Sequence, residues 1–190
     1  MKTFEQEIAD IATTWTPVPH YAARFRDLIM QATLGQVEAA SVWYFEAQEV
    51  AEDVAELLGK SLEVGASVVS AFSPRERWAS NVAKAYAFAS GKPVKGLSNN
   101  LTMANNSLEL GFSALKGLKT NAFARAIAGD ENAVVIDVWM CRAANIATDS
   151  PNKGQYRELS EAVNIVAKEF GLTPRTTQAL IWIIIRGSAE

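Results

Sequence analysis

The sequence has helical periodicity along almost its whole length, and this feature excludes most fold classes. Apolar residues recur at helical spacing in nearly every segment, whereas no alternating pattern of apolar and polar residues continues for more than a few positions. No segment repeats another. We therefore predict an all-α protein, with helices over Thr3–Thr14, His20–Gln31, Val37–Leu58, Leu62–Ala71, Pro74–Ser90, Asn100–Leu110, Lys119–Ala128, Val138–Ala147, Tyr156–Phe170 and Pro174–Arg186.

Three helix starts carry strong local signals. In Ser73-Pro74-Arg75-Glu76 a glutamate follows the serine by three positions and proline takes the first helical position, which predicts a capping box. Thr173-Pro174 repeats the order of cap and proline. Asp137 follows the apolar stretch Ala133–Ile136 and is predicted to cap the next helix, because its side chain can accept free backbone N–H groups.

Composition places the chain among water-soluble proteins of the cytoplasm. Its 190 residues, 49% of them apolar, suit one domain or one domain with a large cap. The single cysteine, Cys141, and the single histidine, His20, argue against disulfide, zinc and iron–sulfur frameworks, so we expect no metal or other cofactor. Acidic residues near the start argue against a secretory signal, and the apolar run Ala179–Ile185 is far shorter than the roughly 20 residues of a membrane span.

Charge divides the chain in two. Residues 1–62 hold four Lys/Arg against ten Asp/Glu, whereas residues 63–190 hold fourteen against eleven. We predict an acidic N-terminal helical segment, residues 1–62, packed on a helical core, residues 63–190. A DNA backbone could meet the basic part while the acidic part faces away. An equally ordinary interpretation is that the acidic helices are simply solvated.

Lys119 and Asp137 are the strongest candidates for chemistry. They lie eighteen positions apart, each at the start of a predicted helix, and two such helices can turn back so that both side chains line one cleft. A positioned carboxylate can stabilise an oxocarbenium-like centre, and a desolvated lysine can attack a sugar carbon to give a Schiff base. The alternatives are a plain helix cap for Asp137 and a surface lysine for Lys119.

Aromatic residues mark a candidate binding pocket. The adjacent Trp43-Tyr44-Phe45, followed by Glu46, cannot all face one core on a helix, so part of this cluster can line a pocket or stack on a base. Plain core packing is the alternative. Trp78 and Asn81 lie one turn apart, and Trp139 follows the predicted cap by two positions, so both tryptophans can flank the same cleft. Neither G-x-x-x-x-G-K-[ST] nor G-x-G-x-x-G occurs, which argues against nucleotide-phosphate loops.

Several segments, in order, match motifs of one superfamily. These are Val68–Ser73 with Asn81–Ala85, Gly96–Asn99 with Ala104-Asn105, Leu115–Thr120, which is similar to a shortened hairpin L-P-G-V-G-x-K-T, and Ala133–Trp139, which is similar to A-V-x-V-D-T/V-H. Together they resemble the helix-hairpin-helix DNA glycosylases, the group that includes endonuclease III and 8-oxoguanine DNA glycosylase. The resemblance covers roughly residues 68–147.

The resemblance implies a glycosylase-like helical fold that acts on a flipped base in DNA. It makes Asp137 the catalytic carboxylate and Lys119 the Schiff-base nucleophile. Such an enzyme needs an aromatic pocket and cationic groups on the strand. We expect substrate binding by Trp43, Tyr44, Glu46, Ser73, Trp78, Asn81 and Trp139, and DNA binding by Arg75, Arg77, Lys116, Gly117, Thr120, Arg125 and Arg142.

The hairpin departs from the superfamily pattern, and two alternatives stay open. Lys116 stands in place of the hairpin proline, the second glycine is missing and two residues are absent before Lys119. The chain is also similar to uncharacterised bacteriophage proteins at Trp43–Ala47, Ser73–Trp78 and Gly129–Trp139, which implies a phage or prophage origin. The alternatives are a phage base-modifying transferase on the same fold and a non-catalytic factor that binds DNA or protein.

Overall fold

The computed structural model describes Thr3, Gln6 and residues 16–187, and these residues form helices and no β-strand. The all-α prediction is confirmed for this part of the chain, whereas the predicted helix over residues 3–14 lies outside it apart from Thr3 and Gln6. The elements are α2 Val18–Met30, α3 Leu34–Leu58, α4 Leu62–Ala71, α5 Trp78–Ala89, α6 Ser98–Leu110, the 3-10 turn η1 Gly111–Ala114, α7 Leu118–Ile127, α8 Val138–Ala143, α9 Lys153–Phe170 and α10 Pro174–Arg186.

The predicted helix start at Pro74 is wrong. Helix α5 begins at Trp78, because Arg75 has a left-handed backbone with φ of 63°, which ends any helix there. Glu76 does not return to the backbone of Ser73 as a capping box requires. Its carboxylate instead accepts hydrogen bonds from Ser80 and Lys84 of α5. The segment before α5 is therefore a turn rather than a helical end.

The predicted helix Val138–Ala147 is too long by one turn. Helix α8 ends at Ala143, and Asn145 takes a left-handed φ of 59°. Asparagine tolerates this conformation better than most residues. The Ile146 amide then donates to the Cys141 carbonyl at 2.9 Å, which closes the helix end. Local turn chemistry at Asn145 overrides the apolar pattern that continues through Ile146.

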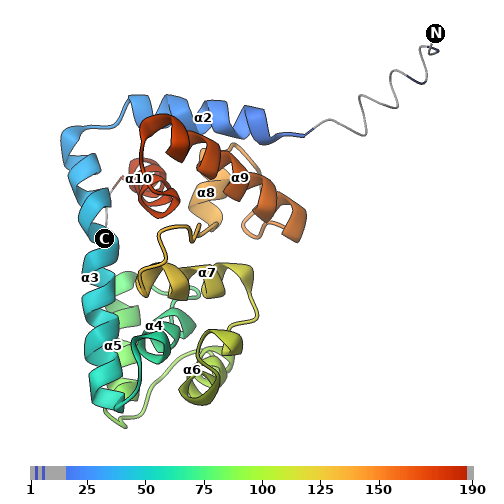
Figure 1. The fold of residues 1–190 in the computed structure, drawn as a ribbon. Helices are drawn as coiled ribbons and strands as arrows, with labels where there is room; N and C mark the ends of the chain where they lie inside the picture. The colour runs from blue at the N-terminus through green and yellow to red at the C-terminus, as the bar shows by residue number, and fades with distance from the viewer. Residues whose placement is uncertain (1–2, 4–5, 7–15, 188–190) are drawn as a thin grey trace.

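The helices form two groups joined by the long helix α3 (Figure 1). One group holds α2, α8, α9 and α10, and the other holds α4, α5, α6 and α7, while α3 runs along both and packs on α4 and α10. The contact between α3 and α4 is very close at Gly65, where a Cβ atom would lie 2.1 Å from the Ala51 carbonyl oxygen. Only glycine fits there, so this position fixes how α4 lies against the α3 spine.

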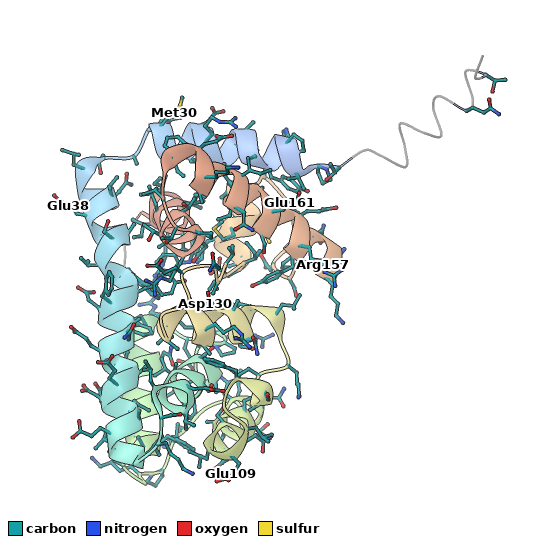
Figure 2. All side chains as sticks on the ribbon, in the orientation of Figure 1. Met30, Glu38, Glu109, Asp130, Arg157 and Glu161 are labelled. Carbon is teal, nitrogen blue, oxygen red and sulfur yellow. The ribbon has the colours of Figure 1, made fainter. Side chains whose placement is uncertain are left out.

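Helices α2 and α3, which belong to the acidic N-terminal segment, contact helices of both groups. Helix α2 lies on α9, and α3 contacts α4, α5, α7 and α10. Figure 2 shows Glu38 at the outer side of α3 and Met30 at the corner between α2 and α3, and both side chains are exposed. The division of the chain at residue 62 stays a prediction. Among the described residues, no helix has the length and apolar character needed to cross a membrane.

Candidate active site

A cavity of about 1240 Å³ opens between the helices that carry Lys119 and Asp137, and both residues line it. Its walls come from α3, α5, α7, α8, α10 and the turn before α5. Arg75 and Arg77 also line it. So do the residues predicted to bind substrate, namely Trp43, Tyr44, Glu46, Ser73, Trp78, Asn81 and Trp139.

The Asp137 carboxylate is held by three N–H donors. Asp137 is the N-cap of α8, and its Oδ1 accepts from the backbone amides of Trp139 at 2.9 Å and Met140 at 3.2 Å. Its Oδ2 accepts from the indole Nε1 of Trp182 at 3.1 Å. The capping interpretation is therefore correct, and it is compatible with a catalytic one because the same carboxylate lines the cavity.

Tyr156 holds in place the segment that precedes Asp137. The buried stretch from Ala133 to Ile136 is neither helix nor strand, and the Tyr156 hydroxyl accepts from the Ile136 amide at 3.2 Å and donates to the Val134 carbonyl at 2.8 Å. The same hydroxyl lies 3.4 Å from the carbonyl of Leu118, the residue before Lys119. Burial raises the pKa of Tyr156 to about 12, so the hydroxyl keeps its proton at neutral pH. One side chain thus links the two candidate catalytic elements.

Lys119 is the second residue of α7 and is half-buried. It forms no ion pair with any residue of the described ranges, although Asp137 and Glu46 line the same cavity. Within the described part of the chain, no carboxylate therefore holds the Lys119 amine in a fixed pair.

Trp43 stands at the centre of an aromatic wall. Its ring lies 5.5 Å from that of Trp78, 5.8 Å from that of Trp182 and 6.0 Å from that of Phe123. These rings come from α3, α5, α10 and α7, so the wall joins four helices. Tyr44, by contrast, is 4% exposed and Phe45 is 59% exposed, as expected for three adjacent aromatics that cannot share one core.

Helix α10 contributes three residues to the cavity that were not predicted from the sequence. Gln178, Trp182 and Arg186 line the cavity at intervals of four residues, which places them on one face of the helix. The sequence did contain a signal for this face. A tryptophan with a glutamine four positions before it and an arginine four positions after it, in an apolar run, indicates a polar stripe on one side of the helix. Gln178 Oε1 accepts from the buried Tyr44 hydroxyl at 2.8 Å, and burial raises the pKa of Tyr44, so the bond fixes the orientation of the amide.

Charge at the cavity is mixed. Its cationic residues are Arg75, Arg77, Lys119 and Arg186, and its carboxylates are Glu46, Glu76 and Asp137. The Lys84 ammonium holds the pKa of Glu76 below its usual range, with help from the Ser80 hydroxyl. Among the described residues, no three His, Cys, Asp or Glu side chains gather as a metal site requires.

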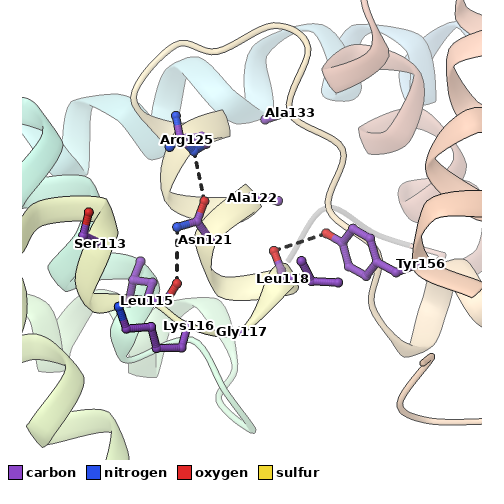
Figure 3. Close-up of a pocket in the computed structure, with 10 residues that line it drawn as sticks. All are labelled: Ser113, Leu115, Lys116, Gly117, Leu118, Asn121, Ala122, Arg125, Ala133 and Tyr156. Carbon is purple, nitrogen blue, oxygen red and sulfur yellow. Dashed lines mark hydrogen bonds between the residues drawn. The ribbon is translucent and has the colours of Figure 1, made fainter. Parts of the chain in front are cut away.

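A second, smaller hollow of about 460 Å³ lies at the predicted hairpin (Figure 3). Lys116, Gly117 and Arg125 line it. Arg125 donates through Nε to Asn121 Oδ1 at 2.9 Å, and Asn121 in turn donates to the Leu115 carbonyl at 3.2 Å. The hairpin turn is thus braced by the side chains of α7.

The residues predicted to bind DNA do not all line the same hollow. Arg75 and Arg77 belong to the large cavity, and Lys116, Gly117 and Arg125 to the small hollow. Thr120 is buried at 8% exposure and donates to the Gly117 carbonyl at 3.1 Å, so it supports the hairpin from inside. Arg142 lines neither hollow, and its guanidinium lies 4.5 Å from the ring centre of Trp139.

These features define an all-helical protein with an aromatic cavity that holds a positioned carboxylate and a lysine. The chain belongs to a family of unknown function, DUF7178, whose model matches residues 9–189. No curated protein and no solved structure matches the chain.

Proposed function

We propose that the protein is a DNA glycosylase-like enzyme that removes a modified or damaged base, with Asp137 as its catalytic carboxylate. One observation carries the proposal: the Asp137 carboxylate, held by three N–H donors, shares an aromatic cavity with Lys119. A flipped base needs aromatic surface to replace the stacking it loses. Trp43, Trp78 and Trp182 supply that surface.

The two candidate catalytic residues have complementary roles. When the bond between base and sugar breaks, positive charge develops at the sugar carbon, and a fixed carboxylate stabilises it without reorganising. The Lys119 amine, once it has lost a proton to water, can attack that carbon as the base leaves with the bonding electron pair, while Asp137 keeps its negative charge. The resulting adduct rearranges to a Schiff base. In a simpler version, water takes the place of the lysine.

Incubation with short DNA duplexes and single strands tests the proposal. The panel carries uracil, oxidised, alkylated and hypermodified bases, with unmodified DNA as control. We expect free base and an abasic strand for at least one substrate, measured by mass spectrometry. Intact strands across the whole panel would contradict glycosylase activity.

The size of the cavity favours one second candidate, a base-modifying transferase. A volume of about 1240 Å³ exceeds the roughly 300–1000 Å³ typical of sites for drug-sized ligands, which leaves room for a base together with a donor group. The same mass measurement separates the two activities. A transferase adds mass to an intact strand when a donor is supplied, whereas a glycosylase removes the base.

DNA binding, if it uses the small hollow, should depend on Lys116 and Arg125. Both residues are exposed there, and each phosphate contact releases counterions, so affinity should fall steeply with salt. We expect the double variant Lys116→Glu with Arg125→Glu to bind DNA about tenfold or more weakly than the wild type. The slope of the logarithm of the affinity against the logarithm of the salt concentration should decrease in magnitude by about two. Fluorescence anisotropy with a labelled duplex at several salt concentrations measures both.

The matched control reverses Lys92 and Lys168, two exposed lysines that line neither hollow. This control should change affinity much less than the hairpin pair. If the affinity changed neither with the salt concentration nor with either pair of substitutions, the partner would not be a nucleic acid.

A further inference from the structure

Two contacts connect Arg186 to the Asp137 carboxylate. The Trp182 indole donates from Nε1 to Asp137 Oδ2 at 3.1 Å, and the Arg186 guanidinium carbon lies 4.6 Å from the centre of the Trp182 ring. All three residues line the large cavity. The guanidinium and the carboxylate are therefore held at one wall of the cavity, with the indole between them.

This contact leaves the donors of Arg186 available to a ligand. A guanidinium over an indole is attracted to the ring face, and the N–H groups in its own plane can still donate. Arg186 is half-buried and forms no ion pair within the described part of the chain. No carboxylate there holds its fork of donors, whose geometry matches two oxygens of a phosphate group.

The charges around the cavity favour an anionic ligand. Glu76 is paired with Lys84, which does not line the cavity, so Glu46 and Asp137 are the carboxylates that remain among the described lining residues. The lining cations are Arg75, Arg77, Lys119 and Arg186. A cavity wall with this excess of positive charge attracts negatively charged groups.

The place of Arg186 specifies which negative group would meet it. In the proposed reaction the sugar carbon lies against Asp137, and the phosphates on either side of that sugar are only a few bonds away. Arg186 lies over the same indole that bonds the carboxylate. A strand whose sugar meets Asp137 thus brings a flanking phosphate toward the guanidinium.

We propose that Arg186 binds a phosphate that flanks the sugar of the reacting nucleotide, with Trp182 as the platform that holds its guanidinium. The chemical class of the ligand group is a phosphate diester of a nucleic acid strand. The inference rests on the proposed function, since it takes Asp137 as the residue that meets the sugar. It adds a phosphate-binding residue and places one strand phosphate in the large cavity, apart from the hairpin hollow.

Binding of an abasic strand tests the inference without base recognition or cleavage. The probe is a short labelled single strand in which one nucleotide is replaced by tetrahydrofuran, a stable analogue of the sugar without its base. The comparison strand carries neutral methylphosphonates in place of the two phosphates that flank this residue. We expect the wild-type protein to bind the charged strand about tenfold or more tightly than the neutral one, measured by fluorescence anisotropy.

Arg186→Gln provides the decisive variant. It should bind both strands about equally, with an affinity near that of the wild type for the neutral strand, because the variant and the methylphosphonates remove the same interaction. Arg186→Lys should show an intermediate preference, since an ammonium contacts phosphate as a single point charge. Circular dichroism checks that each variant is folded.

Arg142→Gln is the matched control. Arg142 also lies in the last turn of its helix, and its guanidinium lies 4.5 Å from the centre of the Trp139 ring, but it lines neither hollow. Any contact that it makes with a strand lies outside the cavity. The ratio of the two affinities should therefore stay that of the wild type.

Each outcome has a distinct meaning. Equal or undetectable binding of the two strands by the wild type would overturn the inference, as would an Arg186→Gln variant that keeps the preference or an Arg142→Gln variant that loses it to the same extent. Base release by the wild type together with such a result would leave the glycosylase activity standing. A preference that depends on Arg186, without base release from any oligonucleotide of the panel, would instead overturn the glycosylase activity and leave the phosphate site standing.

Discussion

An Asp137→Asn variant should bind its DNA substrate but release the base on the order of 10³-fold more slowly than the wild type. The substitution keeps the shape of the side chain and removes its negative charge. That charge is what stabilises the positive sugar carbon in the proposed reaction. Single-turnover rates on the best substrate of the panel measure the change, since they isolate the chemical step from product release.

The structure adds a stability effect to this prediction. Both carboxylate oxygens of Asp137 accept hydrogen bonds, Oδ1 from two backbone amides and Oδ2 from the Trp182 indole. An asparagine has one acceptor and one N–H₂ donor, so its amino group must face one of these donors. We expect a cost of about 1–2 kcal/mol in the free energy of unfolding, measured by urea denaturation.

Trp182→Phe separates the two roles of this carboxylate. It removes the indole donor and keeps the charge and the cap, so base release should slow far less than in Asp137→Asn. In the double variant Asp137→Asn with Trp182→Phe, the loss in the free energy of unfolding should be smaller than the sum of the two single losses. The reason is that the asparagine amino group no longer faces the indole N–H donor of Trp182. A wild-type rate in Asp137→Asn would show that Asp137 is only a helix cap.

The helices were predictable where the capping residues and the helical spacing of apolar residues indicate the same bounds. Leu62–Ala71 and Pro174–Arg186 have the predicted bounds, and Asp137 caps α8 as its place after a buried run indicates. The error at Ser73-Pro74 has a physical cause. Arg75 adopts a left-handed conformation while Asn100, from a distant helix, donates to the Pro74 carbonyl. A tertiary contact of this kind leaves no trace in the local sequence.

Most residues of the candidate site were predictable from the sequence, apart from those of α10, whereas the hydrogen bonds between them were not. Spacing placed Lys119 and Asp137 at two helix starts, and both line one cavity. The Trp182 indole that bonds Asp137 lies 45 positions later in the chain. Tyr156, which joins the Leu118 carbonyl to the segment before Asp137, looks like an ordinary core residue of an amphipathic helix. Such long-range bonds depend on how α9 and α10 pack, which periodicity alone does not specify.

Lys119→Ala should abolish a covalent adduct that the wild type forms with substrate DNA under borohydride. Reduction converts a Schiff base between the lysine amine and the opened sugar into a stable amine, which joins protein and strand. Lys119 is half-buried, lines the same cavity as Asp137 and has no ion pair among the described residues, so its amine is free to approach the sugar. Denaturing gel electrophoresis of labelled DNA measures the trapped fraction.

Two further variants make the test specific to the nucleophile. Lys119→Arg keeps the positive charge and cannot form a Schiff base of this kind, so it should bind DNA and give no adduct. Lys92→Ala removes an exposed lysine outside both hollows and should trap as the wild type does. An adduct that survives in Lys119→Ala would place the nucleophile elsewhere. Base release by the wild type without any adduct would assign the attack to water and leave Lys119 with an electrostatic role.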